Sequence, residues 1–154
     1  MALTDDDYYG TLSGANSYFE GKLLSDSWER ASLIQRRKAL TTATRQIDRL
    51  NFEGGKADPS QPFQFPRNVQ TNQEVPLDIQ RATYELAGVL LDGVDPELEF
   101  QNLGLVSQRF SGVNTSYDTS VPNLHIISGI PSRAAWDYLK PYLRDDQQVI
   151  LLRS

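Results

Sequence analysis

The stretch RRKALTTATRQIDRLNFEGGKADPSQPFQFPR, residues 36–67, decides what fold this chain can adopt. Its first half carries apolar side chains at spacings of three and four, namely Leu40, Ala43, Ile47 and Leu50. Because an α-helix turns by about 100° per residue, these side chains share one face of a helix. Gly54 and Gly55 then end the pattern, as glycines beyond a helix commonly do. The stretch therefore predicts an amphipathic helix over residues 32–52 whose apolar face belongs to the core.

An arm at residues 56–73 follows the two glycines and has no helical or strand pattern. Its prolines remove backbone donors and favour extended conformations in the residues that precede them. They stand at Pro59, Pro62 and Pro66. The arm also carries Phe63 and Phe65, large apolar side chains whose burial is favourable. We therefore expect the arm to pack against a surface, either of its own chain or of a neighbouring one.

Two more long helices are predicted on either side of this stretch. The first spans residues 13–23, with Ser13 as its N-cap. Its apolar stripe consists of Ala15, Tyr18, Phe19 and Leu23. The second spans residues 76–91 and opens with Pro76 at the first helical position. We expect it to add Ile79, Leu86 and Leu90 to the core.

The sequence texture changes after residue 104, where Val, Phe, Tyr, Ser and Thr become frequent. A Ser-Gly pair in the middle of this segment predicts a β-hairpin that pairs residues 105–110 with residues 113–117. A last short helix begins at Pro131 or Ser132 and ends at Pro141. The predicted class is mainly α, a small bundle of three longer helices. To the bundle are added a β-hairpin insertion at 105–117, an extended Pro-rich arm, and a C-terminal helix plus extended tail.

Composition limits the classes of protein to which the chain can belong. It has 154 residues, no cysteine and a net charge of -5. No apolar run reaches the roughly 18 residues that a bilayer span needs, and the first residues do not read as a secretory signal. We therefore expect a soluble protein made inside a cell, without disulfides and without membrane contact. The acidic balance also disfavours a dedicated nucleic-acid binder, which usually has a basic face.

The sequence contains few residues and motifs that could support catalysis. His125 is the one histidine of the chain, and its apolar LHII context favours a structural role over a catalytic one. The nucleophile-elbow, P-loop, dinucleotide-binding and zinc-protease motifs are absent from the sequence. The acidic runs 5–7 and 92–99 lack the spacing of a calcium-binding loop. We therefore predict no enzyme activity, no cofactor and no metal site.

One candidate surface for nucleic acid remains, the basic stripe formed by Lys38, Arg45 and Arg49. Helical spacing places these three side chains on the side of the helix opposite its apolar face. They could neutralise a few phosphates of DNA, or line the channel of an assembly. Alternatively, they form the solvated back of an amphipathic helix or face acidic residues of a neighbour. The stripe lacks interleaved aromatic residues for base stacking, which favours the second interpretation.

The C-terminal region offers a candidate docking surface. Apolar side chains form a stripe along the last helix, consisting of Trp136, Leu139, Tyr142 and Leu143. The chain then ends in an apolar run, Val149, Ile150, Leu151 and Leu152. Because chain ends are normally polar and frayed, an apolar end without an evident intrachain partner indicates docking on another molecule. We therefore divide the chain into a domain at 1–144 and a docking tail at 145–154.

The order of these features resembles a known family. A short helix carries ANSYF and a long helix carries KALTTATRQIDRL. The sequence GGK at 54–56 follows, then FPR at 65–67, and finally Val-Pro at 75–76, which opens a helix with RATYELA. Over about residues 8–91 this order resembles the head–tail connector proteins of tailed bacteriophages, also called adaptor or head-completion proteins. Many of these carry the label of DnaT-like single-stranded-DNA-binding proteins.

The resemblance implies a structural role in the neck of the virion, at the portal vertex. Such a connector, made in the host cytoplasm, forms a homo-oligomeric ring, typically a dodecamer, through heterologous contacts. It joins the portal protein to a downstream neck, stopper or tail-terminator protein and contacts the double-stranded genome only transiently. Phe63, Phe65 and Arg67 become candidates for the subunit interface, and the C-terminal docking residues would bind the portal protein or a neighbouring subunit. The alternative is a single-stranded-DNA-binding replication accessory protein.

Overall fold

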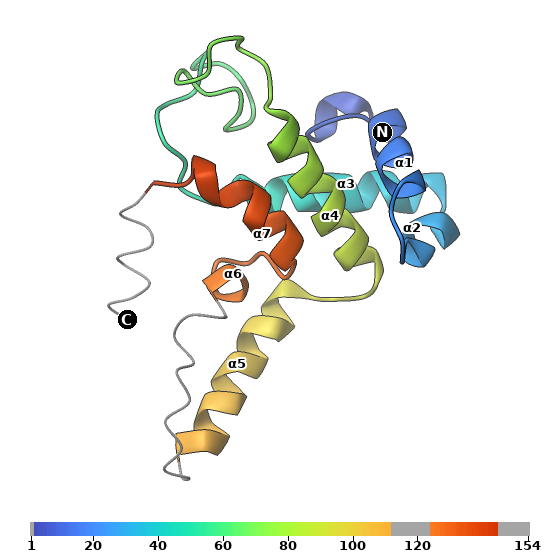
Figure 1. The fold of residues 1–154 in the computed structure, drawn as a ribbon, viewed down its shortest axis with the longest axis vertical. Coiled ribbons are helices and arrows are strands. Elements are labelled where there is room, and N and C mark those ends of the chain that lie inside the picture. The colour runs from blue at the N-terminus through green and yellow to red at the C-terminus, as the bar shows by residue number, and fades with distance from the viewer. Residues whose placement is uncertain (1, 112–123, 145–154) are drawn as a thin grey trace.

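The computed structural model describes the backbone of residues 2–111 and 124–144, and the side chains of residues 2–103 and 124–144. The chain is mainly helical in these ranges (Figure 1). In chain order, the α-helices and the short 3-10 helices (η) are Asp5–Asp7 (η1), Leu12–Glu20 (α1), Asp26–Arg30 (α2), Leu33–Ile47 (α3), Leu77–Leu91 (α4), Pro96–Ser111 (α5), Leu124–Ile127 (α6), Arg133–Leu139 (α7) and Lys140–Tyr142 (η2).

Helix α4 lies at the centre of the fold, with α3 and α7 packed against it and further contacts from α1 and α2 (Figure 1). Residues 82–87 of α4 are all buried, which requires cover on several sides of the helix. The predicted core is confirmed for the residues that are buried, Leu40, Ala43, Ile47, Leu50, Ile79 and Leu86. Leu90 is only partly buried, because it lies near the end of α4.

The helix boundaries follow from capping. Helix α3 starts where predicted, with Ser32 as its N-cap: the side chains of Ser32 and Gln35 each accept the other's backbone N–H. Helix α3 ends at Ile47, earlier than the predicted residue 52, so Phe52 leaves the helix and enters the core from a loop. Helix α1 is capped by Thr11, whose hydroxyl accepts from Gly14 N at 2.9 Å, and not by Ser13.

The predicted β-hairpin insertion is wrong. Helix α5 runs from Pro96 to Ser111 and therefore includes the whole of the first predicted strand, 105–110. The segment 113–117 lies outside the described residues. The N-terminus of α5 is stabilised, because the side chain of Asp95 accepts from Glu97 N at 2.9 Å and proline suits the first helical position. Strand propensity depends strongly on context, and the start of a helix upstream overrides it here.

The described ranges contain no strand, only two isolated antiparallel bridges. One joins Phe52 to Leu143 and the other joins Lys56 to Arg67. The second bridge ties the arm to itself, and the first ties the turn between α3 and the arm to the C-terminal part of the described chain. None of the helices in these ranges has the length and apolarity that crossing a membrane requires.

The C-terminal helix forms where the sequence predicts it. Ser132 caps α7 by accepting from Ala135 N at 3.1 Å, and Pro141 lies in the short helix η2 that follows. Leu143 is the last buried residue of the described chain. The predicted tail, 145–154, lies outside the described residues.

Candidate functional site

The arm packs on its own chain through its aromatic side chains. Phe65 is buried, with its ring centroid 4.7 Å from that of Phe52 and 5.9 Å from that of Tyr142. Phe63 is partly buried, and its ring lies edge-on to that of Tyr9 at 5.3 Å. Phe65 is therefore not an exposed contact for a second subunit, and Phe63 is exposed only in part.

Arg67 is buried, and its guanidinium binds backbone carbonyls of the turn that follows α3. Its guanidinium donates to the backbone carbonyls of Phe52 at 3.1 Å, Glu53 at 3.0 Å and Gly54 at 2.5 Å. Arg144 donates to two of the same carbonyls, those of Phe52 and Gly54, at 2.8 Å each. Burial, together with the positive charge of Arg144, lowers the pKa of Arg67. The arginine that we considered for a subunit interface thus holds the arm and the C-terminal segment together.

Tyr9 joins the N-terminal segment to the arm. Its hydroxyl donates to the carboxylate of Asp48 and accepts from Phe65 N at 3.1 Å. Burial raises the pKa of Tyr9, and the charge of Asp48 raises it further. Burial also raises the pKa of Asp48, although the hydrogen bond from Tyr9 partly opposes this shift. The cluster is a structural anchor, since both groups have partners inside the fold.

The predicted docking stripe of the last helix lies inside the fold. Trp136 is 5% exposed, Leu139 0% and Leu143 4%. Tyr142 is half-buried, and its hydroxyl donates to Asp78 at 3.2 Å. The expectation that this stripe is exposed is wrong, because α7 packs against α4. The remaining docking candidates, Val149, Ile150, Leu151 and Leu152, lie outside the described residues.

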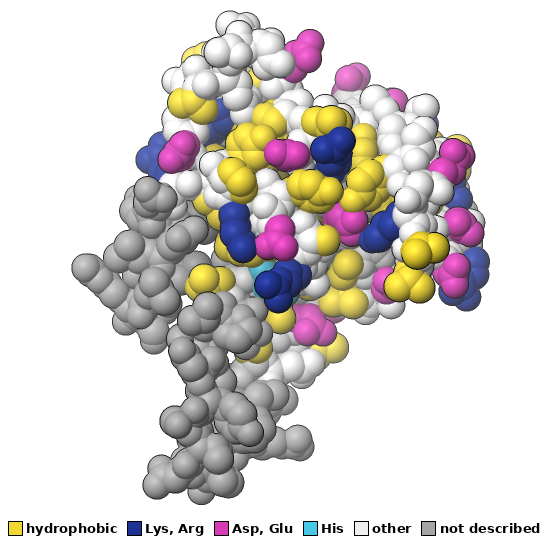
Figure 2. Space-filling view, in the orientation of Figure 1, with side chains coloured by type: hydrophobic (Ala, Val, Ile, Leu, Met, Phe, Trp, Pro, Cys, Tyr) yellow, Lys and Arg dark blue, Asp and Glu magenta, His cyan; other side chains and the backbone are white. Residues whose placement is uncertain are grey.

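The basic stripe faces solvent. Lys38, Arg45 and Arg49 are exposed on α3 and just after it, and in the described part of the chain none of them forms an ion pair. Arg36 turns inward instead, where it donates to the carbonyl of Trp28 at 3.0 Å. Figure 2 shows a face on which acidic, basic and apolar side chains are mixed. Three exposed cations on one helix permit a few phosphate contacts and do not form a broad basic surface.

Exposed apolar side chains precede and follow α2 in the chain, and the sequence pattern did not reveal them. They are Leu23 (89% exposed), Leu24 (96%), Leu33 (56%) and Ile34 (66%), and together we call them the α2 patch. Leu24 also has a φ of 60°, a left-handed conformation that is unfavourable for leucine. The periodicity placed Leu23 in the stripe of the first helix. Because α1 ends at Glu20, Leu23 lies in the loop before α2.

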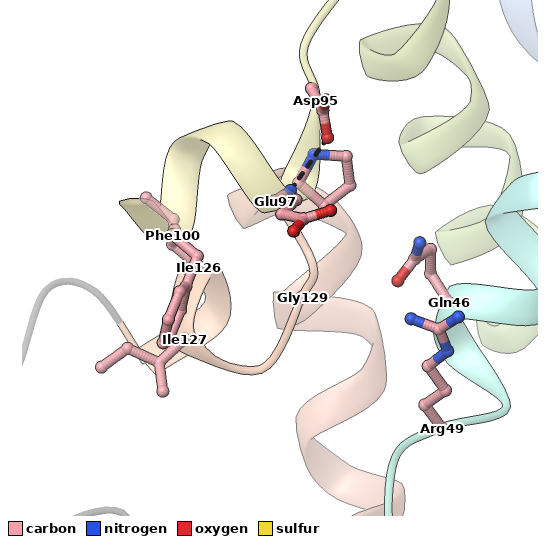
Figure 3. Close-up of a pocket in the computed structure, with 9 residues that line it drawn as sticks. Gln46, Arg49, Asp95, Glu97, Phe100, Ile126, Ile127 and Gly129 are labelled. Atoms are coloured by element: carbon pink, nitrogen blue, oxygen red, sulfur yellow. Dashed lines mark hydrogen bonds between the residues drawn. The ribbon is translucent and has the colours of Figure 1, made fainter. Parts of the chain in front are cut away.

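A groove opens between the end of α3, the start of α5 and α6 (Figure 3). Its volume is about 380 Å³, and its lining residues are Gln46, Arg49, Asp95, Pro96, Glu97, Phe100, Ile126, Ile127 and Gly129. Arg49 faces it from the α3 side, whereas Phe100 and Ile127 form an apolar wall on the other side (Figure 3). We call this the α3–α5 groove. Sequence periodicity could not find it, because its walls come from three separate segments.

His125 has a structural role, as its sequence context indicated. Its Nδ1 lies 2.8 Å from the carbonyl oxygen of Ile130, so the ring can close the turn after α6 by donating to that carbonyl. In the ranges 2–111 and 124–144, no cluster of three or more histidine or acidic side chains could hold a metal ion. The candidate sites that the described residues offer are the α2 patch, the basic stripe and the α3–α5 groove.

Comparison with known proteins identifies the family. A family model described as "Putative DnaT-like ssDNA binding protein" matches residues 2–153. Neither the curated proteins nor the solved structures contain a significant match to the chain. The match agrees with the family label that the sequence resemblance suggested, and it covers nearly the whole chain. The chain therefore belongs to this DnaT-like family.

Proposed function

We propose that the chain is a structural head–tail connector of a tailed phage. It assembles at the portal vertex as a ring of about twelve copies through heterologous contacts. The ring joins the portal protein to the next neck or tail component and leaves a channel for the genome. The protein acts in the virion neck, after synthesis in the host cytoplasm, and carries out no catalytic step.

The α2 patch is the observation that supports this proposal. Leu24 is 96% exposed and Ile34 is 66% exposed, whereas most other large apolar side chains among the described residues are buried or half-buried. Large exposed apolar side chains favour contacts with proteins or membranes, and they form no hydrogen bond or ion pair with a phosphate backbone. The left-handed conformation of Leu24 is a further cost that a functional contact would explain. A protein partner fits this patch better than DNA does.

Ring assembly also needs a rigid subunit, because each copy must present two different faces at a fixed angle. The contacts of the arm make the subunit rigid. Arg67 binds the arm to the carbonyls of the turn after α3, and the hydrogen bond from Phe65 N to Tyr9 binds it to the N-terminal segment. In this proposal the arm shapes the subunit from inside, and the α2 patch contacts a different face of the next copy.

Native mass spectrometry over a range of protein concentrations tests the role of the patch. We expect the full chain to form rings, and we expect the double variant Leu24→Asn, Ile34→Ser to remain monomeric. Asparagine tolerates the left-handed conformation at position 24, so the variant should still fold. Val69→Ser is the matched control, because Val69 is 61% exposed but lies on the arm. Rings that form equally well in the double variant would refute the assigned interface.

The basic stripe favours a second candidate, a single-stranded-DNA-binding replication accessory, and the family description also names ssDNA binding. Lys38, Arg45 and Arg49 are exposed and have no ion-pair partner among the described residues. Three phosphate contacts predict a slope of about -2 when log affinity is plotted against log salt concentration. Fluorescence anisotropy with a labelled oligonucleotide measures it. Arg45→Ala should weaken binding, whereas Arg133→Ala, at an exposed arginine of α7, should not.

A further inference from the structure

Helix α5 projects away from the bundle formed by α3, α4 and α7, with α6 packed beside it (Figure 1). Near its start, Glu97 is exposed and Phe100 is 54% exposed. The two residues are three positions apart, so they lie on one side of the helix, which we call the α5 face. Glu97 forms no ion pair within the described part of the chain. Because helices in proteins are stabilised mainly by packing, the α5 face is suited to a partner that offers an apolar contact and a cation.

The outer side of α3 has this complementary chemistry. Ile34 is 66% exposed, and Lys38 and Arg45 are exposed as well. At about 100° per residue, these three side chains lie within about 40° of one another around the helix, and we call them the α3 face. Neither cation forms an ion pair with another described residue. The α3 face thus joins one member of the α2 patch to two members of the basic stripe.

The two faces match when the helices lie antiparallel. Along α3 the apolar residue comes first and the cations follow, whereas along α5 the acid comes first and the apolar residue follows. Antiparallel packing therefore sets Ile34 against Phe100 and Lys38 against Glu97. Along the helix axes, Ile34 and Lys38 are about 6 Å apart and Glu97 and Phe100 about 4.5 Å, so both contacts can form together.

The two faces of one chain lie too far apart to meet. Glu97 lines the α3–α5 groove together with Gln46, near the end of α3. Ile34 lies at the start of α3, about 18 Å from Gln46 along the helix axis. A second copy of the chain can supply the missing face. Because the α3 face and the α5 face are different surfaces, a contact between them is heterologous and can repeat from copy to copy around a ring.

We propose that the α5 face of one copy packs antiparallel on the α3 face of the next. The inference rests on the proposed connector function, and it names the surface that meets the α2 patch. Phe100 of one copy covers Ile34 of the other, and Glu97 pairs with Lys38. Opposite charges across such a contact fix its register and disfavour pairing of two identical faces.

Native mass spectrometry of two complementary variants of the full chain tests the contact. Ile34→Ser, Lys38→Gln removes the α3 face. Glu97→Gln, Phe100→Ser removes the α5 face. All four side chains are exposed, so both variants should fold, and far-ultraviolet circular dichroism checks this. We expect each variant alone to be monomeric, and we expect an equimolar mixture to form a dimer with one copy of each and nothing larger, because a single functional contact remains.

Charge reversal tests the pairing of Lys38 with Glu97. Lys38→Glu or Glu97→Lys alone should raise the protein concentration needed for assembly about tenfold or more, because like charges then face each other. The chain that carries both changes should assemble nearly as the wild type does. Arg133→Glu, at an exposed arginine of α7, is the control and should have no effect. A double variant that assembles no better than the single variants would overturn the pairing.

The outcomes separate this inference from the connector proposal. Rings that persist when the α5 face is removed, but are lost in Leu24→Asn, Ile34→Ser, would overturn the α5 contact and leave the connector role standing. A mixture of the two complementary variants that gives no dimer, or that gives rings, would also overturn the contact. A wild-type chain that forms no ring at all would refute the connector proposal, and this contact with it.

Discussion

Replacing Arg67 with methionine should lower the free energy of unfolding by about 2 kcal/mol. A hydrogen bond from a charged donor contributes about 1.5–3 kcal/mol, and Arg67 donates to the backbone carbonyls of Phe52, Glu53, Gly54 and Gln64 and to the side chain of Gln64. Two of these acceptors, the carbonyls of Phe52 and Gly54, keep a second donor from Arg144. Glu53 is exposed and Gln64 is half-buried, so water can replace the bonds to these two residues. The expected loss is therefore close to that of one charged hydrogen bond, not of five.

The shared carbonyls make the two arginines interdependent. Arg144→Met alone should cost about 1 kcal/mol, because Arg144 is exposed and Arg67 still donates to both carbonyls. The double variant leaves the carbonyls of Phe52 and Gly54 without either donor. We therefore expect its destabilisation to exceed the sum of the single effects by about 1 kcal/mol.

Urea unfolding followed by tryptophan fluorescence measures all three variants. Both tryptophans, Trp28 and Trp136, are buried at 2% and 5% exposure, so unfolding should change their emission. A double variant whose loss equals or falls below the sum would refute the reasoning, because repulsion between the two cations would then outweigh the shared hydrogen bonds. So would an Arg67→Met variant as stable as the wild type.

Two further predictions concern the core and the pH dependence of stability. Leu86→Ala should lower the free energy of unfolding by about 2–5 kcal/mol, because Leu86 is fully buried. Leu90→Ala should lower it clearly less, because Leu90 lies at the partly buried end of α4. Urea unfolding that ranks the two variants in the opposite order would contradict this packing. Burial raises the pKa of Asp48 above its ordinary value near 4, so the folded state binds the proton more tightly than the unfolded state does. This carboxyl therefore makes the protein less stable as the pH rises above about 4. Asp48→Asn keeps an acceptor for Tyr9, and its stability relative to the wild type should increase as the pH rises above about 4. Thermal melts across this range check it, and a difference between the two proteins that does not change with pH would contradict the assigned shift.

Sequence periodicity predicted the central helices because their signals are long and local. The face of α3 that carries Leu40 and Ile47 follows from the 3.6-residue repeat alone, and Ser32 marks its start with a capping box. Ser132 marks the start of α7 as a simple N-cap, without the reciprocal bond of a capping box. Such signals lie within a few residues of one another, so no tertiary information is needed to read them.

Features that depend on contacts between distant segments were not predictable in this way. The Val-rich and Thr-rich texture after residue 104 suggested strands, but α5 continues through residues 105–111. The stripe that contains Trp136 looked exposed because nothing local shows that α4 covers it. Arg67 looked like a surface residue, and only the fold shows the backbone carbonyls that surround its guanidinium. The α2 patch was missed since a loop and a first helical turn carry no periodic signal.

Binding of the purified full chain to phage capsids that bear the portal but lack neck and tail tests the connector proposal most directly. Cosedimentation should show saturable binding of about twelve copies per capsid, as a closed ring requires, and none to capsids assembled without the portal. The double variant Leu24→Asn, Ile34→Ser should bind poorly, and Val69→Ser should bind as the wild type does. Equal binding to capsids with and without the portal, or no binding to either together with tight and salt-sensitive binding to single-stranded DNA, would contradict the account.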